Sequence, residues 1–120
     1  MKYTLMIYDD EKGGWASLSQ TEQQRMIGEY RQFTQQIKDS GQFVAGEQLH
    51  PTSAATSVRV RNGQRVVTDG PFAETSEQLG GYFLIDARNL DEAIDIAGRI
   101  PSARLGTVEI RPVVEGPSAS

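Results

Sequence analysis

The sequence has no cysteine, and its only histidine is His50. Without cysteine, disulfide bonds, thiolate metal ligands and thiol catalysis are excluded. A single imidazole is too few for a histidine-rich zinc or copper site. We therefore expect neither a metal site nor a cofactor.

Long apolar runs and an excess of positive charge are also missing. No stretch approaches the roughly 18 apolar residues of a membrane-spanning helix, and the N-terminus lacks the basic-then-apolar layout of a secretory signal. We therefore expect a cytoplasmic protein that does not associate with membranes. The net charge of −4 and the pI of about 4.9 disfavour nucleic acid as a partner of the whole chain.

One basic cluster stands out in this acidic chain: Arg59, Arg61 and Arg65 lie in a single expected hairpin. Charges on solvated strands commonly block edge-to-edge pairing. The alternative is a site for an anionic ligand, and the sequence leaves both open.

The size of 13.2 kDa fits one domain with a core of its own. We assign residues 1–114 to this domain. The segment "EGPSAS", residues 115–120, reads as a flexible polar tail.

The first helix is marked at both ends. "SQTE" has the spacing of a capping box, with Ser19 as the N-cap and Glu22 reaching back to it. Gly41 has the position of a C-terminal cap. Between them, one apolar stripe recurs at helical spacing and comprises Met26, Tyr30, Phe33 and Ile37.

The segment "SVRVRNGQRVVTD" predicts a β-hairpin, because Asn62-Gly63 supplies two positive-φ residues for a tight turn. In that register Val58 faces Val67 and Thr56 faces Asp69. One face then carries Val58, Val60 and Val67, and Asp69 emerges at its end.

A second helix is predicted from Asn89, with Glu92 three residues later, to the stop at Pro101. We expect its core face to carry Leu90, Ala93, Ala97 and Ile100. A last strand, "TVEIRPV", follows it. The complete order is β-α-β, a hairpin, and β-α-β, which predicts an α+β fold: a ferredoxin-like split βαβ with an inserted β-hairpin.

In that fold two helices cover one face of an antiparallel sheet. The strands that start at Tyr3 and Gly81 are nevertheless apolar on both faces, as strands buried on both sides are. Something must cover the second face. We expect a symmetric homodimer whose sheets pack face to face, a dimeric α+β barrel.

"VTDGPFAET", "LGGYFLID" and "VEIRPV" together resemble the YCII-related superfamily, in its DGPF-domain branch. The resemblance covers nearly the whole chain and implies a ferredoxin-like dimeric barrel. It implies no settled function: some relatives are linked to sigma factors of the extracytoplasmic type, and a distant branch to dechlorination of aromatic breakdown products.

For the wider superfamily a histidine–aspartate pair has been suggested as the active site. By this resemblance its aspartate, at the end of the first strand, corresponds to Asp9. Its histidine, in the first helix, has no counterpart, because "GEYRQF" puts Glu29 or Tyr30 in that place. Ser76 is a second departure, since many relatives have lysine after "AET".

Asp69 has two interpretations that do not exclude each other. Before Gly70-Pro71 its carboxylate can accept backbone N–H groups two residues on and build an Asx-type turn. It can also be a desolvated general acid or base. We expect the turn first and the site second.

The candidate site has two sets of residues. We predict proton transfer by Asp9, His50 and Asp69, and ligand contacts by Phe72, Glu74, Tyr82 and Arg111. Structural alternatives exist as well. His50 can be an ordinary surface residue, Glu74 a solvated charge and Tyr82 a core residue. Arg111 can form an ion pair with Asp9 or Glu109.

Two functions remain open. The first is a dimeric barrel that binds a small anionic or aromatic molecule, with cofactor-free lyase or isomerase chemistry by carboxylate and histidine proton transfer. The alternative is a non-catalytic regulatory or interaction module associated with a sigma factor of the extracytoplasmic type. The sequence does not decide whether the protein is an enzyme.

Overall fold

The computed structural model describes residues 1–115. Its strands and helices are β1 (Lys2–Asp9), α1 (Gln20–Asp39), β2 (Phe43–Gln48), β3 (Thr56–Arg61), β4 (Gln64–Asp69), β5 (Gln78–Asp86), α2 (Leu90–Gly98) and β6 (Thr107–Pro112). Three short 3-10 helices span Trp15–Ser17, Thr52–Ala54 and Pro101–Arg104. Of the tail predicted over 115–120, all but Glu115 lies outside the described residues.

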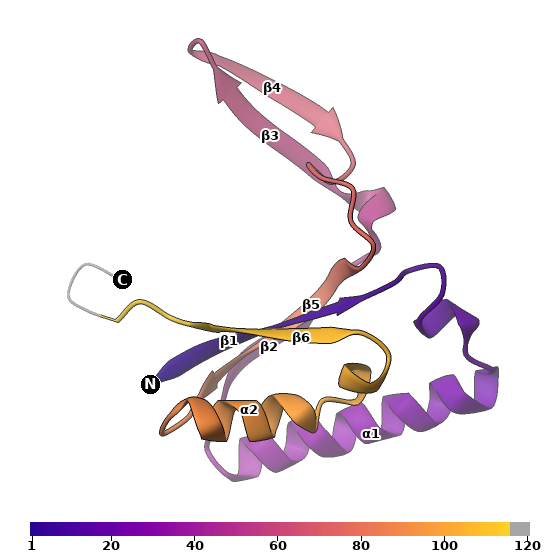
Figure 1. The fold of residues 1–120 in the computed structure, drawn as a ribbon, viewed down its shortest axis with the longest axis vertical. Helices are drawn as coiled ribbons and strands as arrows, with labels where there is room; N and C mark the ends of the chain where they lie inside the picture. The colour runs from indigo at the N-terminus through magenta and orange to yellow at the C-terminus, as the bar shows by residue number, and fades with distance from the viewer. Residues whose placement is uncertain (116–120) are drawn as a thin grey trace.

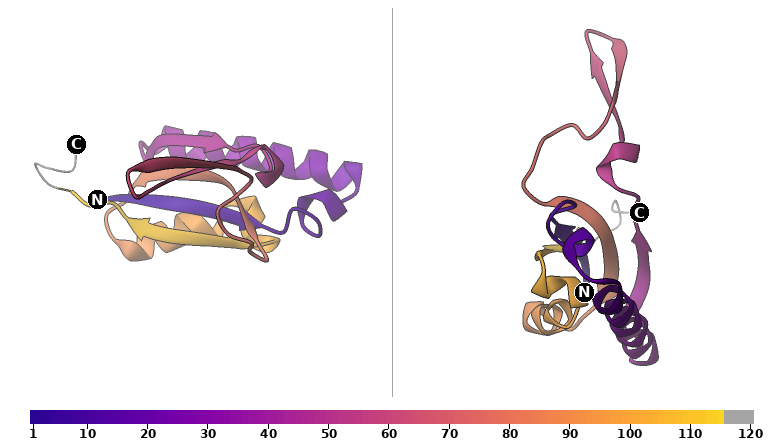
Figure 2. Two further views of the ribbon diagram at one scale, coloured as in Figure 1. Left: turned by 90° about the horizontal axis from the view of Figure 1, so that it is seen from above. Right: turned by 90° about the vertical axis from the view of Figure 1, so that its right-hand side faces the viewer.

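Four strands form an antiparallel sheet in the order β2-β5-β1-β6. Both helices lie on one side of it (Figures 1 and 2). This arrangement confirms the predicted ferredoxin-like α+β fold. We call the opposite side of the sheet the open face, because no helix of the described chain packs on it.

Alternation along β1 explains why the sheet has two different faces. Tyr3, Leu5 and Ile7 point to the helices and are buried, whereas Met6 and Tyr8 point to the open face and are half-buried. The core therefore lies between the sheet and the two helices. Its remaining members are Phe33, Ile37, Phe83, Ile85, Ala87, Ala93, Ile96, Ala97 and Ile100.

Helix α1 begins and ends as predicted. The Ser19 hydroxyl accepts a bond from the Glu22 N–H (3.1 Å), and the Glu22 carboxylate accepts one from the Ser19 N–H (3.0 Å). These bonds hold the pKa of Glu22 below its ordinary value. Gly41 follows the C-cap with φ of 76°, a conformation that glycine adopts without strain. The capping box and the glycine cap are thus confirmed.

Helix α2 differs from expectation at one residue. Asn89 caps it by accepting a bond from the Glu92 N–H (2.9 Å), and Ala93 and Ala97 are buried as predicted. Leu90, however, is 49% exposed. At 100° per residue, the buried face is centred on Ala93, Ile96 and Ala97, and Leu90 falls at its margin. Ile96 supplies the apolar contact that we assigned to Leu90.

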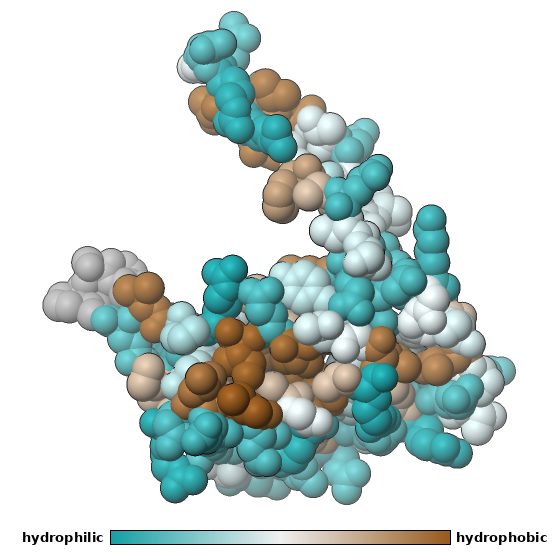
Figure 3. All heavy atoms as spheres, in the orientation of Figure 1, coloured by the Kyte–Doolittle hydropathy of each residue, from teal (hydrophilic) through white to brown (hydrophobic). Residues whose placement is uncertain are grey.

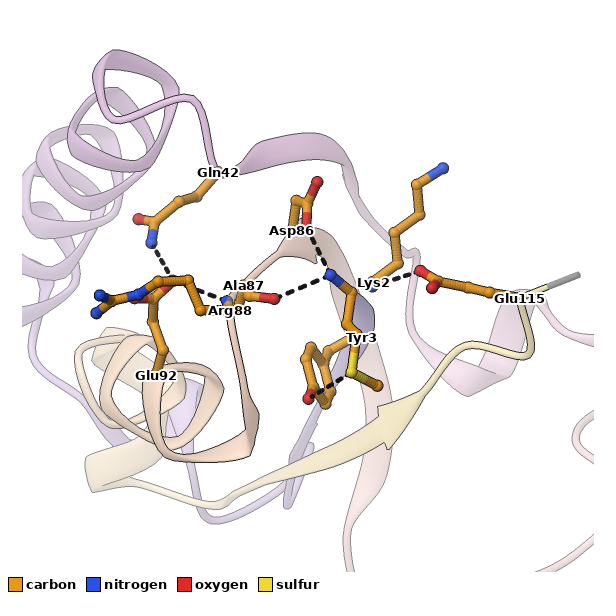
Figure 4. Close-up of polar contacts among 9 residues, drawn as sticks. Lys2, Tyr3, Gln42, Asp86, Ala87, Arg88, Glu92 and Glu115 are labelled. Atoms are coloured by element: carbon orange, nitrogen blue, oxygen red, sulfur yellow. Dashed lines mark hydrogen bonds and ion pairs between the residues drawn. The ribbon is translucent and has the colours of Figure 1, made fainter.

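Polar contacts close the end of the sheet where the chain begins (Figure 4). The terminal ammonium of Met1 donates to Asp86 Oδ1 and to the carbonyl of Ala87, each at 3.1 Å. The N–H of Lys2 donates to Glu115 Oε1 (2.8 Å). The bond from Lys2 to Glu115 therefore joins the start of β1 to the segment that follows β6.

Strands β3 and β4 form a separate two-stranded sheet, which we call the arm (residues 56–69). Asn62 and Gly63 have φ of 53° and 72°, and Val58 pairs with Val67, so the predicted turn and register are confirmed. The arm projects from the sheet on the side away from the helices (Figures 1 and 2). It makes no strand pairing with the main sheet in the described residues.

The base of the arm is held by a carboxylate that the sequence did not single out. Both oxygens of Glu11 accept bonds from Thr52, one from its N–H and one from its hydroxyl, each at 2.7 Å. The Glu11 N–H in turn donates to Gln78 Oε1 (2.9 Å). The loop after β1 therefore binds both chain segments that lead to and from the arm.

Candidate functional site

The seven predicted site residues lie in three regions of the molecule. Asp9 is at the end of β1, and Tyr82 and Arg111 are on the open face. The other four lie on the arm or on the segments that join it to the sheet, and all are exposed: His50, Asp69, Phe72 and Glu74. One chain alone does not bring the predicted proton-transfer residues into a common pocket.

Asp9 has the most unusual environment of the seven. Its Oδ2 accepts a bond from the Trp15 N–H (2.9 Å), while its Oδ1 is buried and has no hydrogen-bond partner among the described residues. A side chain on Gly14 would overlap this carboxylate and displace it from its position. A buried oxygen without a partner costs about 1–3 kcal/mol. Such a group calls for an explanation, and a catalytic role is one such explanation.

Two hydroxyl groups come from elements packed near β1, because the 3-10 helix Pro101–Arg104 contacts both β1 and α1. Tyr30, on α1, donates to the hydroxyl of Ser102, in the 3-10 helix before β6, at 2.6 Å. Burial raises the pKa of Tyr30 above its ordinary value; the Ser102 bond opposes this, and the negative charge of Asp9 adds to it. We call Asp9, Tyr30 and Ser102 the Asp9 cluster.

Sequence reasoning found this cluster only in part. Asp9 is one of the predicted residues, and the sequence leaves Glu29 or Tyr30 in the place where the related proteins have histidine. Ser102 was missed, because its partner is 72 residues away in the chain and no spacing rule connects them. The only local signal is Pro101, which stops the helix and turns the chain.

The raised pKa of Tyr30 predicts a loss of stability at high pH. Above about pH 10, the ordinary pKa of tyrosine, the unfolded chain loses this proton while the folded chain keeps it. The folded state then binds more protons, so the free energy of unfolding falls as pH rises. We expect urea unfolding curves to show this fall, and Tyr30→Phe to reduce its slope. An unchanged slope in Tyr30→Phe would contradict the assignment.

On the open face, Arg111 pairs with Glu109 through its Nε at 2.9 Å, one of the two ion pairs considered from the sequence. Both side chains are well exposed, and such pairs contribute at most about 1 kcal/mol. The pair uses only part of the guanidinium. Arg111 therefore keeps donors that an anionic ligand on this face could use.

The turn at Asp69 is built differently from the Asx-type turn that we predicted. Pro71 has no N–H, so the carboxylate has no donor two residues on, and it makes no hydrogen bond to another described residue. Instead the Gly70 N–H donates to the carbonyl of Ala55 (2.7 Å), and the Ser57 hydroxyl donates to the carbonyl of Gly70 (2.8 Å). Gly70 has φ of 95°, which explains the glycine.

Two surface hollows lie on the helix side of the sheet. One of about 290 Å³ and one of about 170 Å³ adjoin the ion pair between Arg104 and Glu29 (2.8 Å), which raises the pKa of the Arg104 guanidinium. None of the seven predicted residues lines either hollow. Within residues 1–115, no group of three His, Cys, Asp or Glu side chains could hold a metal ion. The same residues include no helix long and apolar enough to span a membrane.

Two comparisons bear on this geometry. The family model of the YCII-related domain matches residues 1–116. A protein of Rhizobium meliloti (strain 1021), described as "Uncharacterized protein R00369", is 37% identical over 117 residues. That match covers 94% of this chain and 92% of the relative, so the likeness extends from β1 through β6.

Proposed function

The chain belongs to the YCII-related domain family, and on this premise we propose that it binds a small anionic or aromatic molecule and moves a proton on it at the Asp9 cluster. Its "VTDGPFAET" segment supports the DGPF branch of the family. The observation that carries the proposal is the buried Oδ1 of Asp9, which has no hydrogen-bond partner among the described residues and whose charge acts on the phenol of Tyr30.

A carboxylate in this position can act as a general base. Asp9 would take a proton from a bound molecule and return it at a neighbouring atom, which is an isomerisation and needs no cofactor. The Trp15 N–H, bound to the other oxygen, holds the carboxylate in a fixed orientation.

Tyr30 would act as a hydrogen-bond donor at the same centre. The phenol of a tyrosine is protonated at neutral pH, and the raised pKa of Tyr30 extends this to higher pH, so it can donate to an oxygen on which charge develops. Ser102 accepts a hydrogen bond from the Tyr30 hydroxyl and fixes the orientation of the ring.

Tyr82 and Arg111 lie on the other face of the sheet from the Asp9 cluster, and Arg111 pairs with Thr4, five residues from Asp9 along β1. They would form a second contact surface, where Arg111 would hold an anionic group. We propose that a second copy covers this face in a homodimer, because its apolar residues Met6, Tyr8 and Leu84 are only half-buried in one chain. A second copy there would exclude water from a molecule bound at Tyr82 and Arg111.

The test is a thermal-shift screen against small carboxylates, catechols and aromatic acids. A ligand at a hundredfold its dissociation constant adds about 2.7 kcal/mol to the stability, which corresponds to a shift of several degrees. We expect Asp9→Asn to abolish the shift, and Tyr30→Phe to weaken it. Asp95→Asn, on the exposed side of α2, is the control and should keep the full shift.

Two results would contradict this function. An equal shift in Asp9→Asn and in the parent protein would put the binding site elsewhere. The absence of any shift across the panel would favour the non-catalytic interaction module instead.

A further inference from the structure

The chain is less compact and exposes more surface than a typical monomeric domain of its length. A compact domain of this length has a radius of gyration of about 13.5 Å, whereas this chain has 16.4 Å. A monomer of its mass exposes about 6,400 Å², whereas this chain exposes 8430 Å². The excess of roughly 2,000 Å² exceeds the about 800 Å² that each partner buries in a standard interface.

The arm contributes several exposed apolar side chains to this surface. Val58, Val60 and Val67 share one of its faces and are 58%, 62% and 56% exposed. Phe72, which follows the arm, is 79% exposed. Hydrophobic residues of the arm stand free of the rest of the chain in Figure 3. A lone two-stranded hairpin is marginally stable in water, so this arm needs a surface to pack against.

The charge of the arm indicates what that surface is. Three arginines and one aspartate give the arm a net charge of +2, so the rest of the chain, with nine cationic and fifteen acidic side chains, carries −6. A basic arm on an acidic body is complementary to the body of a second copy. The arm also projects on the open-face side of the sheet, away from the helices (Figure 1).

We propose that the arm of each copy packs its Val58, Val60 and Val67 face onto the open-face side of a second copy, so that two copies exchange arms about a twofold axis. One interface then covers both apolar surfaces that a single chain leaves exposed. This exchange would bring Asp69 and Phe72 of one copy to the open face of the other copy. A ligand chamber on the open face is therefore built from both chains.

This docking does not depend on the ligand proposed above, and it is tested without one. Because the chain has no cysteine, Val60→Cys can carry a single benzophenone label. We expect irradiation of a mixture of ¹⁴N and ¹⁵N protein to cross-link light copies to heavy copies, at residues of β1 and β5. Arg59→Cys, on the opposite face of the arm, is the matched control and should give few such products. Cross-links confined to one chain, or none, would refute the proposal.

A charge on the apolar face should weaken the assembly. We expect light scattering to show a dimer for the parent protein at micromolar concentration, and Val60→Glu to raise the dimer dissociation constant at least tenfold. Val66→Glu, on the other face of the same hairpin, should leave it within about twofold. Both variants should fold, because both positions are exposed in the single chain. Circular dichroism will check this. A monomeric parent, or equal dissociation constants for the two variants, would overturn arm exchange and leave the arm free for a different protein partner.

Discussion

Replacing Gly106 by alanine is expected to lower the free energy of unfolding by about 3 kcal/mol or more. Gly106 lies between the last 3-10 helix and β6, against the end of β1. A Cβ there would overlap the carbonyl oxygen of Tyr8 and lie 3.0 Å from the Cα of Asp9. Both are backbone atoms, so no side-chain rotation can relieve the overlap. The strand end that carries the Asp9 carboxylate has to move.

The matched control is Gly28→Ala. Gly28 lies within α1, and nothing is within 4 Å of a Cβ built on it. The same substitution there should raise stability by roughly 0.5–1 kcal/mol, because alanine favours the helix. Chemical denaturation of both variants measures the difference, and the melting temperature of Gly106→Ala should fall by roughly 10 °C or more. Similar changes in the two variants would mean that the contact between Gly106 and β1 is not as tight as the structure has it.

Leu5→Ala is expected to cost about 3 kcal/mol, within the usual 2–5 kcal/mol for buried leucine. Leu5 is fully buried at the centre of β1, paired with Phe83 on β5 and Ile110 on β6. Truncation leaves a cavity between the sheet and the helices, where tight packing limits collapse. Denaturant unfolding gives the value.

The neighbouring residue Met6 makes this prediction sharper, because it lies on the opposite face of the same strand. Met6→Ala should lower the stability of an isolated chain less than Leu5→Ala does, since Met6 is only half-buried there. In a dimer that covers the open face, Met6→Ala should also raise the dimer dissociation constant. A cost for Leu5→Ala below about 1 kcal/mol would contradict the burial of this strand.

Local rules predicted most of the fold. Ser19 and Glu22 lie three residues apart and determine the start of α1 by themselves. Asn62-Gly63 likewise determines the hairpin register, because a two-residue turn allows only one pairing. The order of the elements then restricts the sheet to the ferredoxin-like arrangement.

Predictions failed where the outcome depended on tertiary packing. Leu90 has the spacing of the predicted apolar stripe, yet the buried face of α2 is centred on Ala93, Ile96 and Ala97. The prediction for the Asp69 turn failed for a local reason instead, because Pro71 has no N–H to donate to the carboxylate. Ser102 contacts Tyr30 across 72 residues of chain. No periodicity or short motif carries information about such long-range contacts, and the candidate site depends on them.

The place of β1 in the sheet has a consequence for the order in which the protein is made. β1 is an inner strand that is synthesised before both of its neighbours, β5 and β6, which begin at Gln78 and Thr107. Until those segments leave the ribosome, the apolar residues of β1 have no strand to pair with. Helix α1 can form early from local contacts, whereas the sheet cannot form before β6 has been synthesised. Folding of the core is therefore a late event, and β1 is the segment exposed to aggregation in the meantime.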